Sequence, residues 1–297
     1  MTNPIIMHVN FGERAYDSYG KRTVDGVCKM AAELGFDGVE FRGRPPVEYR
    51  EAGVSFLDYV REVAAGKKEY GLKEILFAIG DRDCANPDKD IRAKSIENII
   101  ERARIVNDLC GTTICNTFGN MIRSRISTVL PNANEFHGSA AAAPEDWELT
   151  ADTYHKVGEA IQPLGMRFGF ETHMKYIHDL PHPTKKLLDM IDSPVIGINM
   201  DFGNTVYFPE YPSVAETIDL YGDKLFYTHL KNSVAISTGV RMGTYLSDGQ
   251  INHREYLGKL KEVGYTGPIG IESPRSGDRY WYAKADIAYA KSVMESL

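Results

Sequence analysis

Short apolar runs alternate with longer amphipathic segments along most of this chain. Runs of this kind, bounded by polar residues, are typical of buried parallel strands, because neighbouring layers cover both faces of such strands. The runs that predict strands are Ile5–Phe11, Gly38–Phe41, Glu74–Ile79, Thr112–Thr117, Met166–Phe170, Val195–Asp201, Leu225–His229 and Pro268–Glu272.

A segment with apolar residues at helical spacing follows each run. Thr23 is a suitable N-cap for the first of these helices, and Gly35 is a suitable stop. Pro144, followed by two acidic residues, looks like another helix start. The segments that predict helices are approximately Thr23–Leu34, Val54–Tyr70, Asp88–Cys110, Pro144–Leu164, Thr184–Ile191, Ser213–Tyr221, Arg254–Val263 and Tyr280–Leu297.

Eight strand–helix units in a chain of 297 residues predict a closed (β/α)8 barrel, a TIM barrel of the α/β class that forms a single domain over residues 1–297. A doubly wound open sheet is the alternative. It usually has a glycine-rich first turn, whereas Gly12 stands alone after the first predicted strand. We therefore favour the barrel.

Two stretches break the alternation. The longer one, Phe118–Pro144, follows the fourth strand, and Asn232–Asp248 follows the seventh. Loops of this length in a compact domain are commonly lids or binding loops. For Phe118–Pro144, disorder or an inserted helix is an equally good interpretation.

Four consecutive predicted strands each end on a potential metal ligand: Glu171, Asp201, His229 and Glu272. In a barrel these strands are neighbours, so their carboxyl ends meet at one side of the mouth. Three carboxylates brought together would repel one another, and a divalent cation removes that repulsion. Oxygen ligands with one imidazole favour Mn²⁺, Mg²⁺ or Co²⁺, with Mn²⁺ our first choice. The alternative is that each carboxylate pairs with a nearby Lys or Arg.

A polar substrate bound at the same mouth would need further hydrogen-bonding groups. His173 follows Glu171 by two positions and would share its face if the strand continued, although a packed structural histidine is nearly as good an interpretation. Candidates for substrate binding by their position at strand ends are His8, Glu40, Arg42, Asn116, His173 and Arg275.

Composition narrows the class of partner. Hydrophobic residues make up 43% and charged residues 25% of the chain, as in ordinary globular proteins. The net charge of −7 argues against nucleic acid or an anionic membrane as a partner. The four cysteines form no C-x-x-C pair, which favours free thiols in a reducing compartment. With no signal peptide or membrane span in the sequence, we expect a cytoplasmic protein.

Five short motifs give the chain a more specific resemblance: DGVEF at Asp37–Phe41, then FETH, NMDFGN, THLKN and GIES. As a set, they resemble the xylose-isomerase-like barrel superfamily, in the branch of keto-sugar 3-epimerases and sugar-phosphate isomerase/epimerase-like proteins. The resemblance implies that Glu171, Asp201, His229 and Glu272 bind one divalent metal. It also implies that Glu171 and Glu272 are the catalytic acid/base pair, which deprotonates the carbon next to the carbonyl of a keto-sugar through a metal-stabilised enediolate.

Two departures keep a second activity open. Asn204 stands where several relatives have the histidine of D-x-x-H, and the Phe118–Pro144 loop supplies Glu135 and His137. Related barrels include inosose dehydratases and the large (alpha) subunit of C-glycoside deglycosidases, lyases that act on 3-oxo-glucosides. In such a lyase His137 is our candidate catalytic acid or base. We expect a homo-oligomer for an isomerase, and a complex with a small second subunit for a C-glycoside lyase.

Non-epimerase interpretations fit less well. Apurinic endonucleases among the wider relatives need additional His and Glu ligands and a basic surface that binds DNA, which this acidic chain does not clearly offer. A metal-free sugar-binding barrel is the other alternative, and the metal content would distinguish it.

Overall fold

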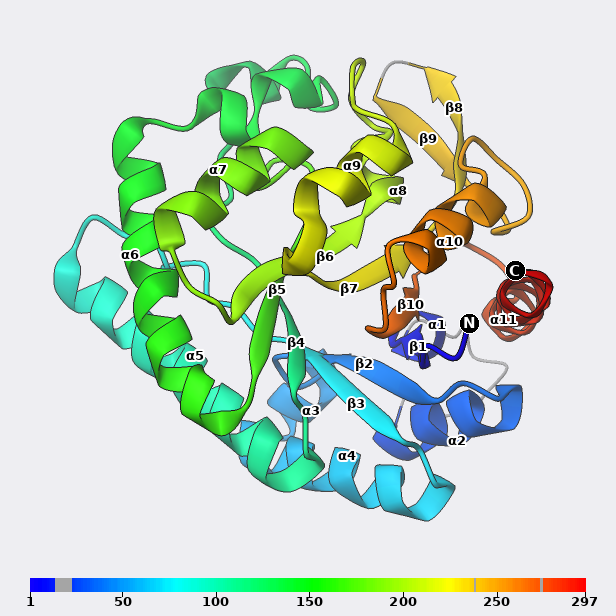
Figure 1. The fold of residues 1–297 in the computed structure, drawn as a ribbon. Helices are drawn as coiled ribbons and strands as arrows, with labels where there is room; N and C mark the ends of the chain where they lie inside the picture. Colours follow the sequence, from blue (N-terminus) through cyan, green and yellow to red (C-terminus); the bar gives the residue numbers. More distant parts are fainter. Residues whose placement is uncertain (14–22, 238, 273–274) are drawn as a thin grey trace.

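Eight parallel strands close into a barrel in the computed structural model, which describes residues 1–13, 23–237, 239–272 and 275–297 (Figure 1). Each strand pairs with the next along the chain, and β1 pairs with both β2 and β10 to close the ring. The barrel strands are β1 (Ile5–His8), β2 (Gly38–Arg42), β3 (Glu74–Ala78), β4 (Ile114–Thr117), β5 (Arg167–Glu171), β6 (Ile196–Asp201), β7 (Leu225–Leu230) and β10 (Ile269–Ile271).

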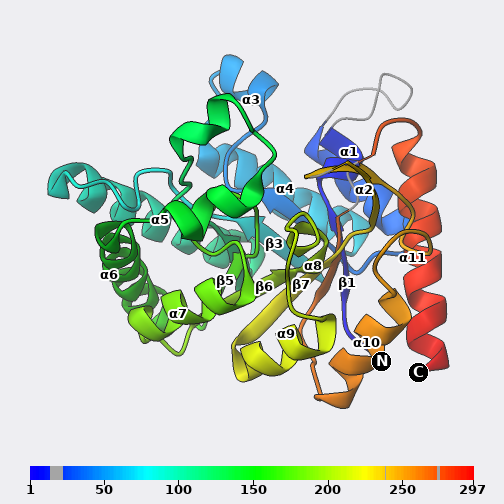
Figure 2. The same cartoon turned by 90° about the horizontal axis from the view of Figure 1, so that it is seen from above.

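Helices surround this ring on the outside (Figures 1 and 2). Their ends follow the predicted capping chemistry: the Thr23 hydroxyl accepts from the Gly26 amide, and Gly35 adopts a left-handed conformation with φ of 79°. The main helices are α2 (Val24–Leu34), α4 (Phe56–Tyr70), α5 (Lys89–Cys110), α6 (Pro144–Ile161), α7 (Pro181–Ile191), α9 (Val214–Tyr221), α10 (His253–Glu262) and α11 (Arg279–Ser296).

The barrel prediction is confirmed, and the closed pairing excludes the open sheet. Some boundaries differ. The first strand ends at His8, where the chain turns into the short helix α1 (Asn10–Glu13), and two more short helices, α3 (Val47–Glu51) and α8 (Phe202–Thr205), follow β2 and β6. Periodicity does not predict single helical turns of this kind, because they depend on local capping and packing.

Both irregular stretches have local structure. The loop after β4 contains three short 3₁₀ helices, Arg125–Thr128, Asn134–Phe136 and Gly138–Ala141. The second stretch contains an antiparallel hairpin, β8 (Ser233–Ser237) and β9 (Val240–Gly243). The two stretches approach each other, since a Cβ added to Gly239 would lie 1.9 Å from the carbonyl oxygen of Asn132.

The main apolar core lies between the barrel and the helices, and a second, smaller apolar cluster is separate from it. It consists of Ile6, Leu76, Ile114 and Tyr227, each on a different strand. Along each barrel strand, every second side chain points into the barrel, and these four residues are among them. This cluster therefore fills part of the barrel interior, and the Tyr227 hydroxyl reaches from it to Glu40, 2.9 Å away.

The prediction of free thiols is confirmed, since the four cysteines are buried and form no disulfide: Cys28, Cys84, Cys110 and Cys115. Burial raises the pKa of the Cys84 thiol to about 12, so this thiol is unreactive at neutral pH. Among the described residues, no helix combines the length and the apolar composition that crossing a membrane requires.

Gly169 lies where β5 and β6 approach too closely for a side chain. A Cβ at this position would lie 2.7 Å from the backbone carbon of Ile198 and 2.7 Å from the amide of Asn199. Gly169→Ala is therefore expected to lower the free energy of unfolding by about 1–3 kcal/mol, the usual cost of overpacking. The control is Gly258→Ala on α10, where the nearest atom to an added Cβ is 3.7 Å away. This control should be neutral or stabilising by up to about 1 kcal/mol in urea unfolding. Equal stability of the two variants would contradict the packing argument.

Candidate functional site

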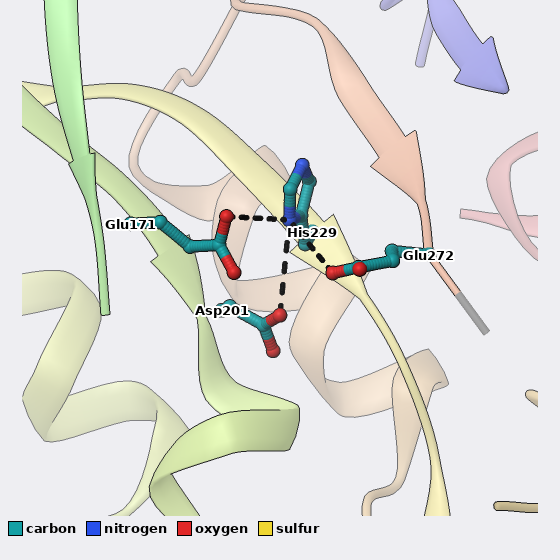
Figure 3. Close-up of side chains that lie close together, drawn as sticks. All are labelled: Glu171, Asp201, His229 and Glu272. Atoms are coloured by element: carbon teal, nitrogen blue, oxygen red, sulfur yellow. Dashed lines mark ion pairs between the residues drawn. The ribbon is translucent and has the colours of Figure 1, made fainter. Parts of the chain in front are cut away.

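The four predicted ligands come together at one place in the barrel (Figure 3). Glu171, Asp201, His229 and Glu272 each offer a ligand atom, and these atoms lie within 4.8 Å of one another. His229 Nδ1 lies 3.9 Å from Glu171 Oε2, 3.7 Å from Asp201 Oδ2 and 3.3 Å from Glu272 Oε2. All four residues are buried, with exposed fractions of 9% or less. The convergence inferred from strand position is thus present, and the role of each residue remains a prediction.

The strand register explains this convergence. Asp201 and His229 are paired neighbours on β6 and β7, and Glu171 lies opposite Asn199 on the β5–β6 pair. Glu272 follows β10 directly, and its amide donates to the carbonyl oxygen of Leu230, 3.0 Å away. Parallel strands of similar register thus place four consecutive strand ends at one level of the barrel.

The donor atoms meet a simple test of fit for a divalent cation. Three of them, Asp201 Oδ2, His229 Nδ1 and Glu272 Oε2, are buried and have no well-directed hydrogen bond. Buried polar atoms without hydrogen bonds are rare in native proteins. Lys231 lies within ion-pair distance of the two carboxylate oxygens, and a cation would satisfy all three atoms. Three carboxylate oxygens and one imidazole nitrogen form a donor set that suits a cation of the Mn²⁺ or Mg²⁺ kind.

Cationic side chains balance part of the negative charge. Lys231 Nζ lies 2.8 Å from Asp201 Oδ2 and 3.1 Å from Glu272 Oε2. Burial alone would lower the pKa of His229, but the Glu40 carboxylate and the other carboxylates raise that pKa well above its usual value. The four side chains therefore create a strong negative potential that favours positive charge at their centre.

The two predicted acid/base glutamates differ in their environments. Burial, followed by the negative charge of Glu272, raises the pKa of Glu171 to about 8. Burial has the same tendency at Glu272, but Lys231 and His8 hold the pKa of Glu272 well below its usual value. As long as no cation balances the carboxylates, these directions favour a proton on Glu171 and an ionised Glu272 at neutral pH.

Glu40 and Asn116 have positions different from those expected for substrate contacts. Glu40 is 0% exposed and lies behind His229, with Oε2 2.7 Å from His229 Nε2. The Asn116 amide donates to Glu40 Oε1 at 3.0 Å and to Glu171 Oε2 at 2.6 Å. Strand-end position alone did not distinguish a side chain that faces the mouth from one that supports a ligand. Both residues thus contact predicted ligands, and their role in substrate binding stays a prediction.

The contact between Glu40 and His229 predicts an effect on metal affinity. A carboxylate on Nε2 fixes the ring so that Nδ1 faces the three other carboxylates, and losing such a partner typically costs 10–100-fold in metal affinity or activity. Glu40→Gln is therefore expected to weaken Mn²⁺ binding by about 10–100-fold, measured by competition with a chelating dye. Tyr227→Phe, which removes only the 2.9 Å hydroxyl contact to the same carboxylate, is the control and should have a smaller effect. Wild-type Mn²⁺ affinity in Glu40→Gln would contradict this role.

Three residues at the cluster were not among the predicted site residues. The Asn10 amide donates to Glu272 Oε1 at 2.9 Å, and Asn204 donates to Glu171 Oε1 at 3.2 Å while its Oδ1 accepts from Lys231 at 3.0 Å. The signal for Lys231 was available, because it follows His229 by two positions, directly beyond the end of β7, where an extended chain keeps it on the same face. Asn10 gave no such signal, since it lies on a short helix that the sequence pattern did not predict.

Three predicted substrate-binding residues lie near the cluster. His8 Nε2 is 3.9 Å from Glu272 Oε1. Arg42 donates to Asn10 Oδ1, and Asn10 in turn contacts Glu272. His173 is half-buried and lines a cavity together with Arg42. These positions agree with substrate binding but do not test it.

Arg275 is not brought to the cluster. Its guanidinium pairs with Asp286 and lies 4.7 Å and 4.4 Å from the ring centroids of Tyr245 and Tyr282. The side chain is 8% exposed, so these contacts account for most of its surface. Arg275 thus packs against α11 through Asp286 and Tyr282, and the substrate contact suggested by its strand-end position stays a prediction.

The histidines of the loops are held in different ways. His137 is 0% exposed within the loop after β4, with Nδ1 3.1 Å from the Ser124 hydroxyl and Nε2 without a partner. His178 is buried and accepts from the Gly119 amide at 2.8 Å, so it anchors this loop. His182 is exposed on α7. Glu135 lines a separate cavity beside Tyr207 and Arg241.

Two larger cavities lie at opposite ends of the barrel. One, of about 530 Å³, is lined by Arg42 and His173 beyond the carboxyl ends of the strands. The other, of about 630 Å³, is lined by Glu74, Thr113 and Arg167, where strands begin. Active sites of (β/α)8 barrels lie at the carboxyl ends of the strands, so the first cavity is the one relevant to the cluster.

Comparison with known proteins gives both a family and relatives. The xylose isomerase-like TIM barrel family model matches residues 28–296. An inosose dehydratase of Clostridium botulinum (strain Alaska E43 / Type E3) is 25% identical over 169 residues, which cover 52% of this chain and 54% of that protein. The chain thus spans about half the length of this relative.

Solved structures share the fold over nearly the whole chain. A D-allulose 3-epimerase from Methylomonas sp., in complex with D-allulose, has a TM-score of 0.73 at 16% identity and covers 98% of this chain and 96% of its own. A xylose isomerase-like TIM barrel protein from Mycobacterium smegmatis, in complex with magnesium, has a TM-score of 0.71 at 20% identity and covers 99% and 97%. Fold, site geometry and family model agree: this chain belongs to the xylose isomerase-like TIM barrel family.

Proposed function

We propose that this chain is a divalent-metal-dependent isomerase or epimerase that moves a proton at the carbon next to the carbonyl of a keto-sugar. The observation that carries the proposal is the convergence of Glu171, Asp201, His229 and Glu272 within 4.8 Å at the ends of successive strands. Similarity to sugar epimerases and to inosose dehydratases supports a carbohydrate substrate. The first choice of metal stays Mn²⁺, with Mg²⁺ or Co²⁺ as alternatives.

Glu171, Asp201, His229 and Glu272 would hold the cation. When bound, it supplies positive charge that stabilises negative charge developing on the carbonyl oxygen of the substrate. In its ionised form, which the positive charge of a bound cation would favour, Glu171 would take the proton from the substrate carbon, with Asn116 and Asn204 holding its two oxygens in place. Glu272, held by Asn10 and Lys231, would pass a proton taken from solvent to the other side of the substrate carbon. Lys231, His8 and His173 are placed to bind substrate oxygens.

Solvent exchange tests this proposal. The Mn²⁺-loaded chain should incorporate deuterium from D₂O next to the carbonyl of at least one ketose and form its epimer or isomer, followed by NMR and mass spectrometry. Treatment with a chelator should abolish both, and Mn²⁺, Mg²⁺ or Co²⁺ should restore them. No exchange with any ketose, inosose or 3-oxo-glucoside by the metal-loaded chain would contradict the proposal.

A lyase or dehydratase acting on a 3-oxo-sugar is the second candidate. It shares the deprotonation step but then expels a leaving group. The similarity to inosose dehydratases and the presence of Asn204 in place of a histidine favour it. The presence of both glutamates on opposite sides of His229 favours the isomerase, which we place first.

His137→Ala is expected to separate these two candidates. A positioned acid or base contributes about 10²–10⁴-fold, so ketose interconversion by an isomerase should change by less than about tenfold in this variant. In a lyase that uses His137, release of the leaving group should fall while exchange of the substrate C–H survives. The variant is assayed side by side on ketoses and 3-oxo-glucosides, with His182→Ala as the matched control. Unchanged ketose interconversion, together with no cleavage of any glycoside, would remove the lyase.

A further inference from the structure

The charged side chains that line the cavity of about 530 Å³ near the predicted metal ligands are mainly positive, although the chain as a whole is acidic. Four arginines line it, from three parts of the fold: Arg42 and Arg44 at and beyond the end of β2, Arg82 beyond β3, and Arg102 on α5. Asp81 is the one carboxylate among the lining residues that the structure describes. A chain with a net charge of −7 thus collects positive charge at this one cavity.

Among the described residues, acidic side chains do little to neutralise three of these guanidinium groups, those of Arg44, Arg82 and Arg102. Arg82 has a single ion pair, with Asp83 at 4.0 Å, and the Arg82 side chain is 95% exposed. In the part of the chain that the structure describes, neither Arg44 nor Arg102 forms an ion pair. Arg102 instead lies over the ring of Phe56, 5.7 Å from its centroid, which helps to fix the direction of its guanidinium. Repulsion among such groups opposes folding, and an anionic ligand would relieve it.

Residues that line the cavity connect it to the proposed reaction site. His173, which lines the cavity, follows Glu171 by two residues. Arg42 donates to Asn10, and the Asn10 amide donates to Glu272 at 2.9 Å. Tyr176, another lining residue, feels charges from both the cluster and the cavity. Burial raises the pKa of the Tyr176 hydroxyl, the negative charge of Glu171 raises it further, and the positive charge of Arg44 lowers it. A ligand extending from the cluster would enter this cavity.

We infer that Arg42, Arg44, Arg82 and Arg102 form a subsite for an anionic group, phosphate or carboxylate, carried by the keto-sugar at the end remote from the reacting carbon. Guanidinium groups bind such groups through paired, charge-assisted hydrogen bonds. The substrate is therefore a sugar phosphate or a sugar acid. This inference rests on the proposed function for the reaction, but the subsite itself can be tested without any reaction.

Binding of unreactive polyols separates the subsite from the chemistry. Xylitol 5-phosphate, xylonate and xylitol have no ketone or aldehyde group to acidify a C–H, so the full chain can bind them without enolising them. Calorimetry should show at least one anionic probe binding about tenfold to a hundredfold more tightly than xylitol, as expected for charged hydrogen bonds. The tighter of the two anionic probes identifies phosphate or carboxylate as the group recognised. Raising the salt concentration from about 0.05 to 0.5 M should weaken binding of that probe and leave the affinity for xylitol unchanged.

A matched pair of double variants tests which residues are responsible. Arg44→Gln/Arg82→Gln should weaken binding of the anionic probe by about tenfold or more and change the affinity for xylitol by less than about twofold. Arg50→Gln/Arg104→Gln removes the same charge from exposed positions on α3 and α5 that do not line the cavity, and it should bind like wild type.

Two results would overturn the subsite. One is that neither anionic probe binds more tightly than xylitol. The other is that tight anionic binding persists in Arg44→Gln/Arg82→Gln or falls equally in both double variants, which would assign it to the cation or to net charge. Failure of the proposed reaction would appear separately, as absence of deuterium exchange on ketoses and their phosphate or acid derivatives while polyol binding is as expected.

Discussion

Glu171→Gln is expected to reduce exchange of the substrate C–H with solvent by at least about 10²-fold, because a positioned base contributes about 10²–10⁴-fold. The variant keeps the size of the side chain and one of the two hydrogen bonds from Asn116 and Asn204, but it cannot accept the proton. Glu272→Gln should cost a similar factor in complete turnover, since it removes the group that returns the proton.

Deuterium incorporation and product formation, measured on the same metal-loaded samples, distinguish these two roles. The matched control is Glu210→Gln, at an exposed position away from the cluster, which should retain wild-type rates. Circular dichroism should show the same fold in all three variants. Near-normal exchange and turnover in both site variants would mean that the base lies elsewhere.

Asp201→Asn should have the largest effect on metal binding. Asp201 is 0% exposed, and its Oδ2 is one of the buried oxygens without a directed hydrogen bond. Loss of a direct carboxylate ligand should weaken Mn²⁺ binding by more than the roughly 10–100-fold typical of a supporting partner. Activity should disappear in parallel at micromolar Mn²⁺.

Thermal unfolding reports on the same change without any assay of activity. A ligand at 100 times its dissociation constant stabilises the folded state by about 2.7 kcal/mol, so Mn²⁺ should raise the Tm of the wild-type chain. The same Mn²⁺ concentration should shift the Tm of Asp201→Asn much less. Asp223→Asn, at an exposed position, should respond like wild type. Equal shifts in Asp201→Asn and wild type would contradict a role for Asp201 in holding the ion.

The sequence predicted the barrel and the members of the cluster because both depend on repeating patterns. Apolar runs alternating with amphipathic segments require strands and helices in turn, and the cluster residues stand at or directly beyond the ends of four of those strands. The positions of Glu171 and His229 in the structure follow from register alone. Local capping signals, such as Thr23 and Gly35, also predicted helix ends correctly.

The supporting residues could not be predicted in the same way. Glu40 and Asn116 stand at strand ends like the predicted ligands, and only the three-dimensional packing shows that they lie behind His229 and Glu171. Arg275 was drawn toward Asp286 by a buried ion pair that joins α11 to the chain after β10. The arginine-lined cavity collects residues from β2, β3 and α5, which no local pattern connects.

The most direct test of the central claim is a crystal structure of the chain soaked with Mn²⁺, with anomalous scattering recorded at the manganese edge. The account predicts one strong anomalous peak, with atoms of Glu171, Asp201, His229 and Glu272 at about 2.0–2.6 Å from it. A peak contacted by fewer than three of these residues would contradict it. So would the absence of a peak between them in a crystal whose other anomalous peaks show that Mn²⁺ has bound.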